Sequence, residues 1–404
     1  MTKSLAIRSV RVIDGTGQVF DNATVLVREG RIAGVGPSRH TPLPRGTRTI
    51  NGRGMTMLPG LIDCHVHLCL GGEPDVICIV EEDSPSLTLL KAAQYAKHTL
   101  EAGITTVRDV GSRDHSIFAL KRAIDRGIVP GPRIVGAGLA ICMIGGHARF
   151  IGREVAGADQ VRAIARKQLM AGADVIKVIA SGGVLTEGTS PEEAQMTSDE
   201  LAAAVEVARQ AGKKVAAHAH GSAGMKNAIQ AGVHSIEHAT LLSDETTELM
   251  KRHGVYMVPT LSALATTAAC RRGCGIPDSA LDKAKAMTKR HQQSFKSALR
   301  NRLLIAMGTD AGTPFNFHGE NAQELERMVA LGMSPMEAIL ASTSAAARLI
   351  GMQDSVGTIQ RGRFADLILL NADPLKNIAR LRDPEKIVGV MKAGQFVAGP
   401  LAHS

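Results

Sequence analysis

Short apolar runs alternate with helix-like segments through the middle of the chain. The apolar runs are rich in Val, Ile and Ala, which is typical of strands buried on both faces of a parallel sheet. Eight runs are predicted to be β-strands: residues 61–67, 104–109, 133–138, 175–180, 214–219, 233–238, 255–260 and 304–309. Segments 86–102, 159–171, 198–211, 279–300 and 334–350 have the spacing or start signals of helices. The pattern predicts an α/β fold, a (β/α)8 TIM barrel.

An open, doubly wound sheet is the structural alternative to a barrel. Such a sheet more usually carries a glycine-rich phosphate loop after its first strand. The sequence has no GxGxxG or GxxxxGK[ST] motif at that place. We therefore favour the barrel.

Both ends of the chain have the pattern of short strands separated by turns. Residues 4–13, 23–27 and 31–35 alternate or are apolar, and Asp14-Gly15 and Glu29-Gly30 are turn signals. Residues 366–370, 387–391 and 395–398 repeat the pattern near the other end. We expect no helix in residues 1–58.

Composition narrows the class of protein. Apolar residues make up 44% of the chain and charged residues 21%, as in an ordinary globular protein. No apolar run reaches the ~18 residues that span a bilayer, and no signal peptide is expected. The net charge is +9, but with no Trp and only two Tyr there is little material for base stacking, so we expect no nucleic-acid partner.

The six cysteines do not look like a disulfide framework in so long a chain, and we expect a reduced, cytoplasmic protein. Cys270 and Cys274 lack matching partners for a zinc site. We also expect a homo-oligomer.

Polar residues at the ends of the predicted strands carry the candidate chemistry. In a barrel the carboxyl ends of the strands form the active site. His65 and His67 are two residues apart on a strand, so both point to one side. The remaining candidates from other strands are Lys177, His218, His238 and Asp310.

Each of these residues also has a structural interpretation. A lone His at a strand end is more often a hydrogen-bonded structural residue, and Asp310 could cap a helix. Lys177 is harder to explain in this way, because an unpaired ammonium in a barrel interior is costly. Four His, one Lys and one Asp at strand ends in this order are unlikely to occur together by chance, so we expect them to share one site.

Further candidates lie in the predicted loops. His147, in a Gly-Gly-His turn, is predicted to act on the substrate, with Arg149 nearby as a further substrate-binding candidate. His220, two residues past His218, points toward the same mouth and is also a substrate-binding candidate, and His318 is a weaker one. For Arg108 we favour a structural ion pair with Asp109 over a carboxylate clamp, and we expect Cys64 to be packed.

The motif from Pro59 to His67, PGLIDCHVH, resembles the strand-one signature of the amidohydrolase superfamily. The other metal positions match in order, in the branch with two metals and a carboxylated lysine. The chain is most similar to the imidazolonepropionase-like group, which contains Xaa-Pro dipeptidases, Xaa-Arg/Lys carboxypeptidases and ochratoxin-type amidases. The matching segments are residues 145–147, 180–183 and 237–238. The resemblance implies a composite β-sandwich domain from residues 1–58 and 355–404, and a barrel domain from residues 59–354.

The resemblance also implies a mechanism. Two divalent ions, expected to be Zn²⁺, would be bridged by carboxylated Lys177. His65, His67 and Asp310 would hold one side, and His218 and His238 the other. A metal-bridging hydroxide would attack the carbonyl, with Asp310 as general base.

The implied substrate is a small molecule with an amide or peptide bond, either a dipeptide or an N-acyl amino acid. Relatives in the peptidase group place a Tyr at the position of His220 for carboxylate binding, so this chain departs from them there. The first alternative is a cyclic amide hydrolase of the hydantoinase or lactam type. The second is a deaminase, and Lys177 argues against the deaminase only. A non-catalytic scaffold is a further alternative, but all six ligands are present.

Overall fold

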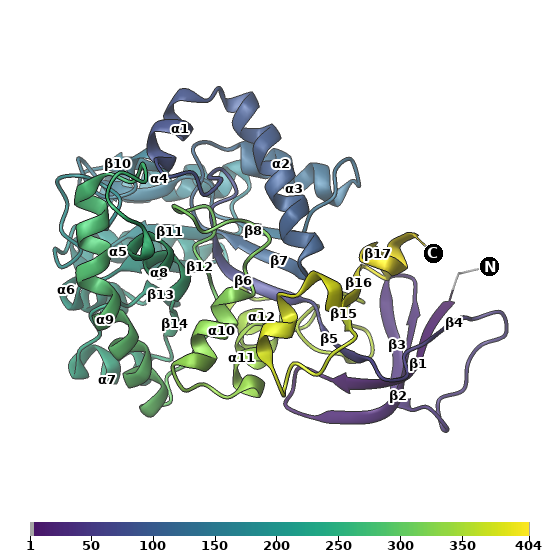
Figure 1. The fold of residues 1–404 in the computed structure, drawn as a ribbon. Helices are drawn as coiled ribbons and strands as arrows, with labels where there is room; N and C mark the ends of the chain where they lie inside the picture. Colours follow the sequence, from purple (N-terminus) through teal and green to yellow (C-terminus); the bar gives the residue numbers. More distant parts are fainter. Residues whose placement is uncertain (1–3, 404) are drawn as a thin grey trace.

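Strands from both ends of the chain share one sheet in the computed structural model, which describes residues 4–403. The sheet has eight strands in the order β17-β16-β15-β5-β1-β2-β3, and β4 also pairs with β1. Their bounds are β1 Ser4–Ile13, β2 Val19–Arg28, β3 Arg31–Pro37, β4 Arg48–Asn51, β5 Thr56–Pro59, β15 Leu367–Leu370, β16 Ile387–Lys392 and β17 Gln395–Ala398. Figure 1 shows these purple and yellow strands gathered on one side of the molecule. The strands predicted near both termini are confirmed.

The rest of the chain contains two parallel sheets. One has six strands in the order β10-β9-β11-β12-β13-β14, and the other has three, β6-β7-β8. Their bounds are β6 Leu61–Val66, β7 Ile104–Asp109, β8 Arg133–Gly136, β9 Ala140–Met143, β10 Gly152–Val155, β11 Val175–Ile179, β12 Lys214–Ala219, β13 Ser235–His238 and β14 Tyr256–Val258. Seven of the eight predicted strands are therefore present, and the α/β fold is confirmed. The pattern missed β9 and β10.

The eighth predicted strand, residues 304–309, is not a regular strand. One bridge pairs Ile305 with Met257, and further on the Cys64 N–H donates to the Met307 carbonyl at 2.9 Å. The Thr309 N–H donates instead to the Asp63 carboxylate at 3.1 Å, so a side chain takes the place of a strand partner. The segment contacts β14 and β6 in turn, yet the strand pairing leaves two sheets and not a closed ring.

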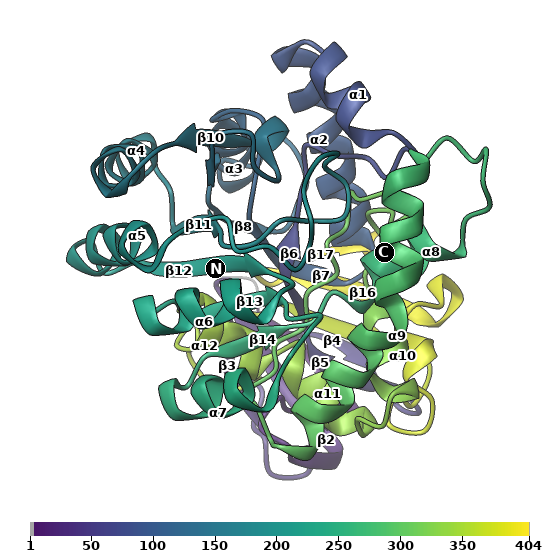
Figure 2. The same cartoon turned by 90° about the vertical axis from the view of Figure 1, so that its left-hand side faces the viewer.

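Helices lie outside the parallel strands, as Figure 2 shows for α4 to α7. Their bounds are α1 Val76–Glu82, α2 Pro85–Glu101, α3 Ser116–Asp125, α4 Ala158–Ala171, α5 Ser198–Gln210, α6 Ser222–Ala231, α7 Asp244–His253, α8 Leu261–Ala269, α9 Asp278–Arg300, α10 Gln323–Ala330, α11 Pro335–Ala341 and α12 Ser344–Ile350. Short 3₁₀ helices are η1 Arg149–Ile151, η2 Ile378–Leu381, η3 Pro384–Lys386 and η4 Pro400–His403. None of the helices within residues 4–403 is both long enough and apolar enough to cross a membrane.

The segment 334–350, predicted as one helix, is two helices. Ser334 caps α11 as expected, but the helix ends before Ser342 and Thr343. The Thr343 hydroxyl donates to the Ile339 carbonyl, and the Ser342 carbonyl accepts the N–H of Ile62 in β6. Local side-chain bonds and this contact with β6 replace the helical pattern.

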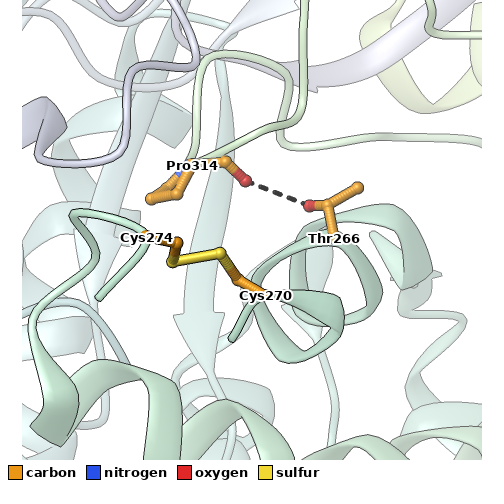
Figure 3. The surroundings of a disulfide bond; sticks show 4 residues. All are labelled: Thr266, Cys270, Cys274 and Pro314. Carbon is orange, nitrogen blue, oxygen red and sulfur yellow. Dashed lines mark hydrogen bonds between the residues drawn. A yellow bond between two sulfur atoms is a disulfide. The ribbon is translucent and has the colours of Figure 1, made fainter. Parts of the chain in front are cut away.

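The expectation of reduced cysteines is wrong for one pair. Cys270 and Cys274 form a disulfide in the turn after α8, and Thr266 in the same helix donates to the Pro314 carbonyl (Figure 3). Their Cα atoms are 6.4 Å apart, because the chain reverses between the two residues. The other four cysteines are free, and Cys64 is buried and packed as predicted.

Candidate functional site

The strand-end residues meet at one place. His65 and His67 come from β6 and its end, and each places its Nε2 atom 3.3 Å from Asp310 Oδ1. His218 on β12 and His238 on β13 lie beside them, with ring centroids 4.7 Å apart. The rings of His65 and His238 are 5.0 Å apart. Five side chains that are up to 245 residues apart in sequence therefore form one buried cluster.

Two groups of three residues at this place, one of which adds His220 to the cluster, have the spacing of metal ligands. His65, His238 and Asp310 form one, and His218, His220 and His238 form the other, with ligand atoms within 4.8 Å of one another. His220 was predicted to contact substrate only. Because its ligand atom lies within 4.8 Å of those of His218 and His238, His220 is an additional candidate metal ligand.

Lys177 and Asp310 have buried polar atoms that lack partners in the described part of the chain. Lys177 Nζ and Asp310 Oδ1 are buried and form no hydrogen bond, although two His rings approach Oδ1 at 3.3 Å. Burial lowers the pKa of Lys177 to about 8, so the neutral amine forms at a lower pH than in an exposed lysine. Burial would raise the pKa of Asp310, but the facing imidazoles of His65 and His67 hold it well below its usual value. This donor set suits divalent metal ions.

Protein groups bond to the Nδ1 atoms of three of the histidines and thereby orient their rings. His65 Nδ1 donates to Glu237 at 2.8 Å, and His67 Nδ1 donates to the Gly111 carbonyl at 2.8 Å. His238 Nδ1 bonds to the Thr260 hydroxyl at 2.7 Å. Such partners fix which nitrogen faces a metal. Burial lowers the pKa of His218 and of His238 well below the usual value, so both imidazoles are neutral.

A buried ion pair supports this arrangement, and the sequence did not predict it. Arg108 donates to Glu237 at 2.9 and 3.0 Å and to the Cys64 carbonyl at 2.6 Å. The structural role predicted for Arg108 agrees with these contacts, but its partner is Glu237 and not Asp109. Burial would raise the pKa of Glu237, but Arg108 and His65 lower it to about 2. In the sequence, Glu237 stands out only as part of a Glu-His pair. Its pairing with an arginine on another strand could not be predicted, because no local pattern in the sequence indicates it.

Three residues at this site have left-handed backbone angles. The φ angles are +72° at His238, +51° at Thr260 and +62° at Asp310. Non-glycine residues rarely adopt such angles, and each costs of order 1–3 kcal/mol. His238 ends β13, Thr260 follows β14 by two residues, and Asp310 follows the irregular segment 304–309, so the left-handed angles lie where the chain leaves these segments.

A cavity opens beside the cluster. His147, His220 and Asp310 line it together with His218, His238 and an apolar wall that consists of Val184, Leu185, Ala263 and Leu264. The His147 ring centroid lies 4.6 Å from that of His218, and burial lowers the pKa of His147 to about 3. The structure therefore places His147 and His220 next to the candidate metal ligands.

Two other substrate candidates lie elsewhere. His318 is buried away from the cavity lining, and its ring bonds to the Leu70 carbonyl at 2.9 Å and stacks on Tyr95. Arg149 is exposed in η1 and does not line the cavity. The loop geometry that separates them from the cluster has no local sequence signal.

Comparisons with known proteins identify the family of the chain. Residues 56–397 match the sequence model of the Amidohydrolase family. Ochratoxinase from Aspergillus niger is 31% identical over 421 residues, covering 96% of this chain and 85% of that protein. Imidazolonepropionase from Rubrobacter xylanophilus is 26% identical over 414 residues, covering 94% of this chain and 92% of that protein.

Similar solved structures are consistent with the family match. A Xaa-Pro dipeptidase with bound methionine in its active site has a TM-score of 0.91 at 33% identity, covering 98% of this chain and 100% of that one. A prolidase in complex with N-methylphosphonate-L-proline has a TM-score of 0.91 at 28% identity, covering 98% and 99%. From the family match and these relatives, the chain belongs to the amidohydrolase family and is a hydrolase of C–N bonds.

Proposed function

We propose that the chain hydrolyses the amide bond of a dipeptide or an N-acyl amino acid, with two divalent metal ions at the histidine cluster. The observation that carries the proposal is Lys177 Nζ, which is buried without a hydrogen-bond partner in the described chain. A carbamate on this nitrogen would give an anionic ligand among the neutral imidazoles. The similarity to an ochratoxinase and a Xaa-Pro dipeptidase supports an amide substrate.

The residues divide into two ligand sets. His65, His67 and Asp310 would hold one ion, His218 and His238 the other, and carboxylated Lys177 would join them. The ions, which we expect to be Zn²⁺, would supply Lewis-acid chemistry that lowers the pKa of water and polarises the carbonyl. Asp310 takes the proton of the attacking water and passes it to the leaving amine. The facing imidazoles of His65 and His67 hold its pKa well below the usual value, so the side chain is in the ionised form that a proton acceptor needs.

Substrate recognition falls to His147 and His220, which line the cavity. His147 Nδ1 is bonded to the Thr186 hydroxyl, which leaves Nε2 for the substrate. A role for Arg149 or His318 would need a closer approach than the structure has. A substrate carboxylate would therefore be bound by imidazole N–H groups and not by an arginine.

The finer fold is also inferred. The segment 304–310 hydrogen-bonds to both β14 and β6, which supports a barrel that the two sheets and this segment complete. We infer that residues 59–354 form this barrel domain, and that residues 1–58 with 355–404 form the β-sandwich domain.

A substrate panel tests the activity. Dipeptides, N-acyl amino acids and cyclic amides are assayed with added Zn²⁺, each free acid beside its C-terminal amide. We expect hydrolysis of the linear free acids, with at least about tenfold lower kcat/KM for the amides, equivalent to ~1.4 kcal/mol. Turnover of cyclic amides alone would favour the cyclic amidohydrolase.

Metal analysis tests the ligand set independently. Protein purified without chelator should contain about two equivalents of divalent metal. Lys177→Ala should lose most metal and activity, and short carboxylic acids in the buffer should partly restore both. Lys285→Ala, at an exposed site on α9, is the control. An unmodified Lys177 in a metal-loaded crystal would contradict the proposal.

A further inference from the structure

The loop between β11 and α5 forms one side of the cavity. Val184 and Leu185 belong to this loop and line the cavity together with His147. Val184 also packs into an apolar cluster with Ala284 and Met287 of α9. The shape of this side of the cavity therefore depends on how the loop sits on α9.

Lys283 on α9 fastens the loop at three points. Its Nζ atom donates to the Thr189 carbonyl at 2.7 Å, the Thr186 carbonyl at 3.0 Å and the Gly183 carbonyl at 3.5 Å. The side chain is half-buried, and its ammonium has three donors for these three acceptors. Hydrogen bonds from a charged donor are the stronger kind.

The same loop fixes the position of His147. The Thr186 hydroxyl is bonded to His147 Nδ1 at 2.8 Å and accepts the Ala148 N–H at 3.3 Å. Gly183 lies against the other side of the ring, where an added Cβ would come within 2.3 Å of Nε2. Thr186 and Gly183, which bear two of the carbonyls held by Lys283, are thus the residues that contact His147.

We propose that Lys283 is a positioning residue for amide hydrolysis. It holds residues 183–189 so that His147 and the Val184–Leu185 wall face the scissile bond. This inference rests on the proposed function, because it assigns His147 to the substrate. Lys283 is not among the residues that line the two cavities at the cluster, and within residues 4–403 the hydrogen bonds of its Nζ atom go to carbonyls of the loop.

The test compares Lys283→Met with Lys285→Met. Met keeps most of the aliphatic stem and removes all three donors, and Lys285 is an exposed lysine on the same helix. Hydrogen–deuterium exchange of peptides within residues 182–190 should be at least about fivefold faster in K283M. With a substrate that the wild type hydrolyses, kcat should fall at least about tenfold while KM changes less than about threefold. Metal content should stay equal to that of the wild type.

Two further variants separate positioning from general stability. Lys283→Arg should restore exchange protection and most of kcat, since a guanidinium also donates to several carbonyls. Thr186→Val removes the link to His147 and leaves the lysine in place. If both residues act through one loop, the double variant K283M/T186V should lose little more kcat than K283M alone.

The outcomes are distinct. Exchange in K283M within twofold of K285M would overturn the proposal, and so would faster exchange with unchanged kcat. If K283M does not fold, the proposal is supported by a wild-type exchange pattern in K283R together with a loss of kcat in T186V. Full activity of T186V would then overturn the proposal. A wild-type protein that hydrolyses no amide would overturn the proposed function, and the exchange experiment would still decide whether Lys283 holds the loop.

Discussion

Each residue at the cluster depends on a neighbour that sets its charge or its direction. Glu237 receives hydrogen bonds from both Arg108 and His65, so one buried carboxylate orients an imidazole and neutralises a guanidinium. The strand-end histidines and Asp310 could be predicted because two-residue spacing and strand order are local properties of the sequence. The partner of Arg108 could not, because Glu237 lies 129 residues away in sequence.

At the same scale, Asp310 can be tested as the proton acceptor. Asp310→Asn should keep the fold and much of the metal, because an amide oxygen can still ligate weakly. Turnover should fall by at least about a hundredfold, the lower range for loss of general acid–base catalysis. Asp199→Asn, an exposed carboxylate on α5, is the control, and kcat and metal content are measured for both. Near-normal turnover of D310N would place the base elsewhere, with His147 the first residue to test.

At the scale of elements, α8 joins the cluster to the cavity wall. It begins after Thr260, which holds His238, and carries Ala263 and Leu264 of the wall. Its first turn has no side-chain cap from Thr260; Glu324 in α10 instead accepts the N–H groups of Leu261 and Ser262 at 2.7 and 2.8 Å. The Glu324 side chain, which belongs to another helix, thus supplies acceptors for two N–H groups that the start of α8 leaves free.

Burial raises the pKa of Glu324 to about 7, which predicts a pH dependence of stability. Between about pH 4.5 and 7 the folded protein keeps a proton that the unfolded chain releases, so the free energy of unfolding should fall as pH rises. The decrease should be up to about 3 kcal/mol, and Glu324→Gln should remove it. Urea unfolding at pH 5 and 7.5 measures it, with the exposed Glu320→Gln as control. A slope equal in E324Q and E320Q would contradict this prediction.

The sequence predicted elements well where periodicity decides and poorly where distant contacts do. The predicted helix over residues 334–350 is two helices because the Ser342 carbonyl accepts a hydrogen bond from β6. The last predicted strand is irregular because the Thr309 N–H donates to the Asp63 carboxylate. Arg149 and His318 were placed near the substrate from their loops alone, yet loop geometry follows from packing that the pattern does not contain.

At the scale of the whole molecule, the terminal sheet meets the parallel strands through Asp366. Its carboxylate accepts hydrogen bonds from Arg133 at the start of β8, at 2.8 Å, and from the Ala393 N–H at 2.7 Å. The Arg133 guanidinium also lies 3.9 Å from the Phe364 ring centroid. These contacts, remote from the cluster, hold the two parts together.

Asp366→Asn should loosen this joint without affecting chemistry. The loss should be about 1–3 kcal/mol of stability, since a buried charged hydrogen bond is weakened, with kcat unchanged. Asp354→Asn, whose carboxylate is 85% exposed beside Arg363, should change stability by less than about 1 kcal/mol. Thermal unfolding and kcat are measured for both. Equal stability of the two variants, or a loss of kcat in D366N alone, would contradict the expectation.

The sheet shared by both ends of the chain has a consequence for synthesis. β5 ends at Pro59 and pairs with β15, which begins only at Leu367. A ribosome adds roughly 5–20 residues per second, so β5 emerges some 15 to 60 seconds before its partner, given the roughly 300 residues between them. During that interval an apolar strand edge is open to other nascent chains. Slower elongation or a bound chaperone should therefore change the yield of native protein more than its final stability.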